Sequence, residues 1–346
     1  DYGVYTWWHW MNGNITKDGI TCDLEAMKAN GIAGYQLFEA GSGIPIGPVE
    51  SLSDEWVDLI LHTLKESERL GLEFAMHNCP GWSSSGGPWI TPDKAMQIIT
   101  WSETKVTGGK QIRMPLPTPK HMFDYYIDTF CLAIPANMEV IPKSSVLELS
   151  GQLKDGVLTW AAPAGEWLII RFGQTAKDQK NKSAPSKSTG LDCDKFSTEA
   201  LDYHLDCMFK RLMPAMEKVA KHSKIGLLID SYETGDQDWT SDMPAYFEQK
   251  HRYALYPFLP ALANKVVESE ESTKRFLFDF RRTRADLFAE RYYAHFQKRC
   301  KEKGIITYTE PYGGNMMEEL QVAQQLDINM GEFWCGQTVL WANYKY

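Results

Sequence analysis

Three glutamates have surroundings that suit acid–base chemistry, because each follows a predicted strand and has aromatic residues and glycine as neighbours. Glu233 lies in Asp-Ser-Tyr-Glu-Thr-Gly, Glu310 in Tyr-Thr-Glu-Pro-Tyr-Gly-Gly and Glu332 in Gly-Glu-Phe-Trp. An uncharged, partly dry environment raises the pKa of a carboxyl group and suits a general acid. Two carboxyl groups across a sugar ring are the usual means of cleaving a glycosidic bond. One such glutamate is more often solvated or ion-paired, but three with the same neighbours favour an active site.

Aromatic and polar residues at the predicted strand ends are of the types that bind sugars. The chain has 12 Trp, 16 Tyr and 15 Phe, and many of the tryptophans lie beside Gly, Asn or His. Burial in a core accounts for most of them, but rings beside amides and carboxylates also suit sugars. A single polar strand end usually caps a helix, and a lone histidine is usually a core residue. The candidate substrate-binding residues are Trp8, Trp10, Asn12, Glu39, His77, Asn78, Trp82, Tyr232, Tyr308, Glu310 and Trp334.

Strands and helices alternate along most of the chain, which predicts a parallel sheet with crossover helices. A (β/α)8 barrel carries its active site at the carboxyl ends of such strands. The chain supplies about six of the eight strands, so we expect an α/β fold of the TIM-barrel type whose last two strands are missing. The strands are predicted side by side, parallel and in chain order, at 7–11, 32–39, 72–78, 225–230, 305–309 and 328–333. Helices are predicted at 20–29, 53–70, from 91 onward, and at 197–221, 244–267, 273–303 and 316–325.

The alternation stops between residues 106 and 175, where Pro, Thr and β-branched residues predominate. Alternating polar and apolar residues and a Lys-Asp-Gly turn predict an inserted antiparallel β subdomain there. The segment 174–188 is rich in Lys, Ser and Asn and is expected to be a mobile loop. The predicted domains are the first part of the barrel at 1–105, the insertion at 106–175 and the second part of the barrel at 176–346.

The composition argues against several other classes of protein. The net charge is −9 without a basic stripe, so nucleic-acid binding is not expected. No apolar run approaches the ~18 residues of a membrane helix. Seven scattered cysteines without a Cys-x-x-Cys pair predict neither a disulfide scaffold nor a zinc site. Two alternatives stay open: a non-catalytic carbohydrate-binding protein, and a serine esterase that uses Ser83, whose loop is one residue off Gly-x-Ser-x-Gly.

Seven short motifs, spread over essentially the whole chain, form a recognisable set. They are Trp-His-Trp-Met-Asn-Gly at 8–13, Asn-Gly-Ile-Ala-Gly at 30–34, His-Asn-Cys-Pro-Gly-Trp-Ser at 77–83, Ser-Gly-Gly-Pro-Trp at 85–89, Gly-Leu-x-x-Asp-Lys at 190–195, Asp-Ser-Tyr-Glu at 230–233 and Gly-Glu-Phe-Trp at 331–334. Together they resemble glycoside hydrolase family 106, the α-L-rhamnosidases. The resemblance implies a (β/α)8 barrel that removes terminal α-L-rhamnosyl residues from plant cell-wall or microbial glycans. It also implies inversion of configuration, a calcium ion near the sugar and a periplasmic or secreted location.

The resemblance also assigns roles to the three glutamates. Glu233 corresponds to the proposed general acid, and Glu332 to a second active-site glutamate that acts as base or binds calcium and sugar. Glu310 is a third, which with Glu332 is the predicted metal ligand. Family members continue with a further strand that carries another essential Glu, and with β-sandwich domains. We therefore expect the natural chain to extend beyond residue 346 and this piece alone to be inactive if that Glu is the base.

Overall fold

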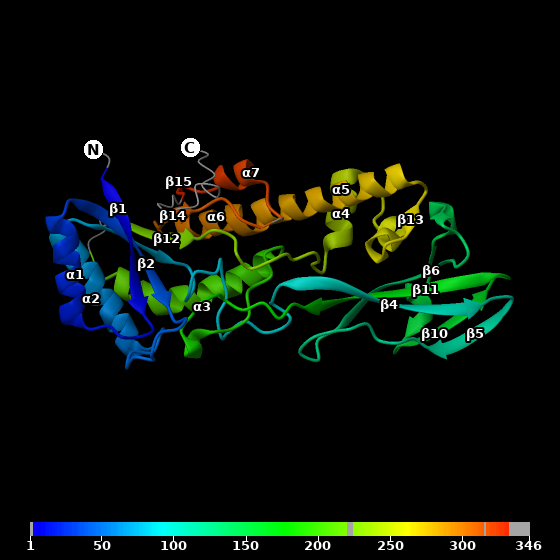
Figure 1. Ribbon diagram of the computed structural model, residues 1–346, viewed down its shortest axis with the longest axis horizontal. Coiled ribbons are helices and arrows are strands. Elements are labelled where there is room, and N and C mark those ends of the chain that lie inside the picture. The colour runs from blue at the N-terminus through cyan, green and yellow to red at the C-terminus, as the bar shows by residue number, and fades with distance from the viewer. Residues whose placement is uncertain (1–2, 220–223, 315, 332–346) are drawn as a thin grey trace.

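A six-stranded parallel sheet forms one end of the molecule (Figure 1). The computed structural model describes residues 3–219, 224–314 and 316–331. Every neighbouring pair of strands is parallel, and the order in space is the order along the chain, so the predicted strand order is confirmed. The strands are β1 (Val4–Met11), β2 (Ile32–Ala40), β3 (Glu73–His77), β12 (Ile225–Ile229), β14 (Ile306–Thr309) and β15 (Ile328–Asn329).

The sheet is open within the described residues, because β1 and β15 are its two edges and do not pair with each other. The architecture shown is therefore a parallel α/β sheet, and the closed (β/α)8 barrel expected from the sequence is not formed by this part of the chain. The strands that are present do follow the parallel order that a barrel requires. Each crossover carries the chain to the next parallel strand in one direction around the sheet.

Three helices pack against one another on one face of this sheet and enclose part of the main hydrophobic core, and a further helix, α6 (His295–Lys301), packs against β14. The second of the three shows why the sequence forms these elements. It begins after Ser53, whose hydroxyl accepts a hydrogen bond from the Trp56 amide, and it ends at Gly71, which adopts the left-handed conformation at φ 65°. The helices are α1 (Lys17–Ala29), α2 (Asp54–Leu70) and α3 (Thr198–Met216).

A second group of helices runs from the far end of the molecule back toward the sheet (Figure 1). The helical stretch predicted over 244–267, with breaks at the prolines, is divided into an α-helix and a 3-10 helix, because Pro257 and Pro260 each lack the amide hydrogen that an α-helix needs. The helix predicted over 273–303 is a continuous run whose middle part is a π-helix. The elements are α4 (Met243–His251), η4 (Tyr256–Ala263), α5 (Glu270–Leu287), η5 (Phe288–Ala294), α6 (His295–Lys301) and α7 (Glu319–Ala323). No helix in the described ranges is long and apolar enough to cross a membrane.

The other end of the molecule consists mainly of antiparallel strands, with one short parallel pair formed by β7 and β13 (Figure 1). They begin at Gln97, which is earlier than predicted, because the run Ile-Ile-Thr at 98–100 is β-branched and extends the first strand. The helix predicted from Thr91 is accordingly a turn. The strands are β4 (Gln97–Thr107), β5 (Lys110–Pro115), β6 (Ile127–Pro135), β7 (Val140–Ile141), β8 (Leu147–Glu148), β9 (Leu153–Lys154), β10 (Val157–Ala162), β11 (Glu166–Ala176) and β13 (Val266–Val267), with 3-10 turns η1 (Lys143–Ser145), η2 (Ser150–Gln152) and η3 (Ser186–Ser188). The division of the chain into three domains stays a prediction.

Candidate active site

The alternation of side chains along β1 decides which tryptophans can meet a ligand. Trp8 and Trp10 point toward the helices, where Trp8 donates to Asp23 and Trp10 lies edge-on to Trp56 of α2. Both are buried in the main core. A strand sends alternate residues to opposite faces, and these two face the helices, so their role in substrate binding stays a prediction that this arrangement does not support. Trp7, which the sequence did not single out, lies on the other face and stacks on Phe38 with ring centroids 4.1 Å apart.

The face opposite the helices, called here the open face, carries its own small cluster of Phe38, Ala75, Leu228 and Tyr308. Strand register brings His77, Leu228 and Tyr308 into one layer across the sheet. His77 on β3 is opposite Leu228 on β12, and Leu228 is in turn opposite Tyr308 on β14. Trp82 packs against the same cluster from the loop after β3. The predicted residues His77, Trp82 and Tyr308 are therefore brought together.

His77 is the polar centre of the open face. Its ring lies 3.6 Å from the Phe38 ring, and its Nε2 atom lies 3.7 Å from Asp230 Oδ2. Burial lowers the pKa of His77 to about 3, with the Gly81 backbone acting in the opposite direction, so the imidazole is neutral at physiological pH. Neither ring nitrogen forms a hydrogen bond within the described residues. A neutral imidazole has one donor and one acceptor nitrogen, which suits it to binding a sugar hydroxyl.

Two buried carboxyl groups stand at the carboxyl ends of the neighbouring strands β12 and β14. Asp230 and Glu310 come two residues after Leu228 and Tyr308, so they share the open face with His77. The Glu310 amide donates to the Ile229 carbonyl, which continues the pairing of the two strands, and its side chain is 1% exposed. Sequence reasoning missed Asp230 as a site residue, although its position directly after an apolar strand was the available signal.

Glu233 lies at the rim of this group, and its environment differs from the prediction. Its side chain is 43% exposed, and Lys182 Nζ lies 3.1 Å from its Oε2 atom. The expected uncharged, partly dry surrounding is therefore wrong in this structure. The reason is that Lys182 is 51 residues away in the sequence, so the neighbours of Glu233 along the chain could not reveal it.

Lys182 belongs to a segment that packs across the carboxyl edge of the sheet. The Trp82 amide donates to the Lys182 carbonyl, and the Gly41 amide after β2 donates to the carbonyl of Ser183. Asn181 is buried, and its amide group donates to the Pro80 and Ser188 carbonyls. These hydrogen bonds join the segment to the strand ends, and the mobility expected for the loop over 174–188 stays a prediction.

The side chains of Asn12 and Asn78 form hydrogen bonds to backbone carbonyls. The Asn12 amide donates to the Ile44 carbonyl at 2.6 Å, in a turn where Asn12 itself has φ 49°. The Asn78 amide donates to the carbonyls of Ser84 and Leu228, and its oxygen lies 3.1 Å from His204 Nε2. Their polar atoms are thus used to shape loops, and a role of these two residues in binding substrate stays a prediction.

Glu39 and Tyr232 are also directed away from the open face. The Glu39 carboxylate accepts hydrogen bonds from Trp56 Nε1 and Ser51 Oγ, both at 2.7 Å, on the helix side of β2. Burial raises the pKa of Glu39 to about 7, and the two donors act against that shift. Tyr232 donates to the Gly235 carbonyl and packs edge-on against Phe288. The role predicted for both residues as direct sugar contacts stays a prediction that these contacts do not support.

A buried ion pair stabilises the loop after β3. Lys195 Nζ lies 2.5 Å from Asp192 Oδ1, and both side chains are completely buried. Ser83 Oγ donates to the other oxygen of Asp192 at 2.9 Å, and Ser85 also donates to this carboxylate. Ser83 is buried and serves Asp192, so the structure gives no support to a serine esterase.

The described residues do not supply the predicted calcium site. Within 3–219, 224–314 and 316–331, no three His, Cys, Asp or Glu side chains form a group that could hold a metal ion. Glu310 accepts a hydrogen bond from Tyr312 at 2.8 Å. The predicted base and metal ligand Glu332 and the predicted sugar contact Trp334 lie outside the described residues. Calcium stays a prediction, and no step of the chemistry below depends on it.

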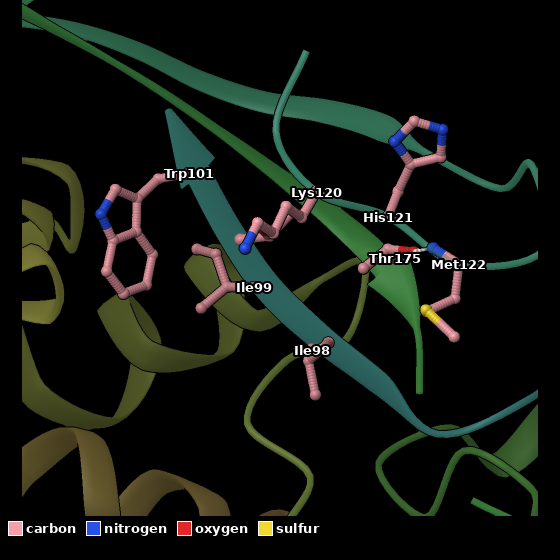
Figure 2. A pocket seen from close by; sticks show the side chains of 8 residues that line it. Ile98, Ile99, Trp101, Lys120, His121, Met122 and Thr175 are labelled. Atoms are coloured by element: carbon pink, nitrogen blue, oxygen red, sulfur yellow. Dashed lines mark hydrogen bonds between the residues drawn. The ribbon is translucent and has the colours of Figure 1, made fainter. Parts of the chain in front are cut away.

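A separate hollow of about 300 Å³ lies on the antiparallel part, beside β4 and the end of β11 (Figure 2). No carboxylate lines it, so it can bind a ligand but cannot supply a general acid for glycoside cleavage. The candidate active site therefore stays at the carboxyl edge of the parallel sheet. The residues that line the hollow are Ile98, Ile99, Thr100, Trp101, Lys120, His121, Met122 and Thr175.

A parallel α/β sheet with carboxylates and a histidine at its carboxyl edge is compatible with glycoside hydrolase chemistry. The chain belongs to glycoside hydrolase family 106, whose model, described as alpha-L-rhamnosidase, matches residues 3–129 and 120–345. The recognition made from the sequence motifs is thus confirmed.

Two individual proteins illustrate the relationship. A protein of Formosa agariphila that carries the name "Putative beta-glucuronidase" is 42% identical over 96% of this chain, which spans 31% of its length. A solved rhamnosidase from Novosphingobium sp. PP1Y is 24% identical, with a TM-score of 0.83 over 94% of this chain and 48% of that protein. The second comparison shows that the fold is shared. The chain thus spans less than half of the length of either protein.

Proposed function

We propose that the protein containing this chain is a glycosidase that removes terminal α-L-rhamnosyl residues from plant cell-wall or microbial glycans with inversion. The observation that carries the proposal is the gathering of His77, Asp230 and Glu310 on one face, with Glu233 at its rim. In the complete protein, further strands would close the sheet into a (β/α)8 barrel. Because its glycans lie outside the cell, we propose a periplasmic or secreted location.

Glu233 is the proposed general acid, since its partial exposure lets it reach the glycosidic oxygen of a bound glycan. A second carboxylate on the opposite face of the ring would activate water, at roughly 6.5–9.5 Å from the acid in an inverting enzyme. Glu332 is the proposed base. His77 and Asp230 would hold hydroxyl groups of the sugar, and the apolar surface of Trp82 and Tyr308 would meet its C–H face.

The test uses the full-length protein and the substitution Glu233→Gln, which keeps the shape of the side chain but removes its proton. We expect kcat/KM for a natural rhamnosyl glycan to fall about 10²–10⁴-fold. An aryl rhamnoside with a good leaving group needs little protonation and should be affected much less. Equal loss for both substrates would mean that Glu233 only positions the sugar. No loss for either would place the active site elsewhere.

Glu103→Gln is the matched control for that experiment. Glu103 lies on β4, and its carboxylate is 3.1 Å from Lys265, the same separation as in the Lys182–Glu233 pair. Its substitution should leave both rates unchanged. Glycan binding that survives Glu233→Gln in a protein without any measurable cleavage would favour the non-catalytic carbohydrate-binding alternative.

Hydrolysis of a β-glucuronide is a second candidate function. It is favoured by the name of the 42% identical relative and by the ammonium group of Lys182 beside Glu233, because a uronic acid carries a carboxylate. Aryl α-L-rhamnoside and aryl β-D-glucuronide, compared at equal concentration, distinguish the two activities. The product anomer, followed by NMR immediately after cleavage, tests inversion for whichever substrate is used.

A further inference from the structure

Lys182 differs from an ordinary surface lysine in how firmly its backbone is placed. The preceding residue Asn181 is buried, and the Lys182 carbonyl accepts the Trp82 amide at 3.1 Å. The following residue Ser183 adopts the left-handed conformation at φ 57°, which a non-glycine residue takes at a cost of about 1 kcal/mol. The side chain of Lys182 is not held by these backbone contacts; it is 51% exposed and reaches Glu233.

The loop after β3 is shaped to accept this backbone. Gly81 has φ 81°, and a β-carbon at this position would collide with the Lys182 carbonyl oxygen. Glycine is therefore required there by both conformation and space. A solvated lysine that merely improves solubility needs no such support. The structure instead aims one ammonium group at the residue proposed as the general acid.

A second lysine reinforces the positive charge on the same side. Lys177 Nζ donates to the Asp236 carbonyl at 2.6 Å, and it would lie 3.2 Å from a β-carbon on Gly235. Lys177 and Lys182 thus both contact the short segment 233–236. The segment 177–187 contains four lysines and one aspartate, although the whole chain has a net charge of −9.

The ion pair between Lys182 and Glu233 is weak enough for another anion to replace Glu233 as the partner of Lys182. Both side chains are about half exposed, and an exposed pair is worth only about 0–1 kcal/mol. A general acid must also carry a proton when it acts, and a protonated Glu233 no longer offers Lys182 a negative charge. An anionic group brought by the substrate could take its place.

We propose that Lys182 is a specificity-determining residue that binds an anionic substituent of the glycan, a carboxylate or a sulfate ester, next to the cleaved bond. The inference rests on the proposed function, because it assumes that Glu233 meets the glycosidic oxygen. The inference adds to the proposed function by assigning acidic glycans as the substrate class, whichever sugar the enzyme releases. Lys177 lies where it can add to the attraction for the same acidic chain.

The experiment compares kcat/KM of the full-length protein for paired oligosaccharides. One pair is a uronic-acid oligosaccharide and its carboxyl-reduced form, and the other is a sulfated oligosaccharide and its desulfated form. The wild type should prefer the anionic member of at least one pair about 10–100-fold, the range expected for a charge-assisted hydrogen bond. The pair that shows the preference distinguishes a carboxylate from a sulfate.

Lys182→Met should remove most of that preference, whereas Lys265→Met, the partner of Glu103, should retain it. The readout is the ratio of anionic to neutral kcat/KM, which a general loss of folding or catalysis would not change. An unchanged ratio in Lys182→Met, or the absence of any preference in the wild type, overturns the inference. Cleavage of neutral glycans would then leave the proposed function intact. If no glycan is cleaved but anionic ones bind in a Lys182-dependent manner, the proposed function fails and the anion site stands.

Discussion

The imidazole of His77 and the carboxyl group of Asp230 lie 3.7 Å apart, at the ends of two adjacent parallel strands. Both side chains are almost completely buried, and that separation is too long for a direct hydrogen bond. A sugar hydroxyl can bridge such a gap by donating to one group and accepting from the other. The pair is therefore better suited to holding substrate than to stabilising the sheet.

Asp230→Asn tests this role of the pair. The substitution keeps the shape of the side chain but makes it a weaker hydrogen-bond acceptor. The kcat/KM for hydrolysis of the glycoside substrate should therefore fall about 10²-fold or more. Asp128→Asn is the control, because Asp128 forms a 2.7 Å ion pair with Arg171 in the antiparallel part. That variant should lose some stability but retain activity. Equal activity of both variants would remove Asp230 from the site.

Local sequence patterns predicted the strands well but could not predict which face each side chain takes. The runs at 32–40 and 225–229 are apolar and bounded by turns, so their parallel pairing follows from simple rules. Trp8 and Trp7 are adjacent and chemically alike, and only the register of β1 assigns one to the core and the other to the open face. Contacts across the fold, such as that of Lys182 with Glu233, leave no signal in the neighbouring residues.

Lys195→Met should destabilise the protein strongly. The substitution leaves the completely buried Asp192 carboxylate without its cation, and breaking a buried ion pair costs about 3–5 kcal/mol. The free energy of unfolding from urea titration measures the loss. Lys110→Met, on the exposed edge of β5, should change it by less than about 0.5 kcal/mol. The double variant Lys195→Met with Asp192→Asn should recover part of the stability, and a further loss would contradict the pairing.

Gly81→Ala tests the placement of Lys182 without touching a charged group. Gly304 is the matched control, because it has φ 70° and nothing lies within 4 Å of an added β-carbon, whereas Gly81 has φ 81° and faces the Lys182 carbonyl. Gly304→Ala should cost about 1 kcal/mol of unfolding free energy from backbone strain alone. Gly81→Ala should cost more and should also lower kcat/KM. Equal effects of the two substitutions on both measurements would show that the close approach to Lys182 has no consequence.

Glu39 should make the protein less stable as the pH rises toward neutrality. Its pKa is raised from 4.5 to about 7 by burial, so between these values the folded protein keeps a proton that the unfolded chain has released. The stabilising contribution is therefore complete below pH 4.5 and is lost as the pH rises through 7. At about 1.4 kcal/mol per pKa unit, the loss is on the order of 3 kcal/mol. Glu39→Gln cannot titrate and keeps an amide near Trp56 and Ser51. The unfolding free energies of the two proteins are measured by urea titration at pH 5 and pH 8. Between these pH values the wild type should lose more stability than the variant, so the variant should be more stable relative to the wild type at pH 8 than at pH 5. Parallel pH dependence would show that the Glu39 carboxyl group is ionised in the fold at both pH values.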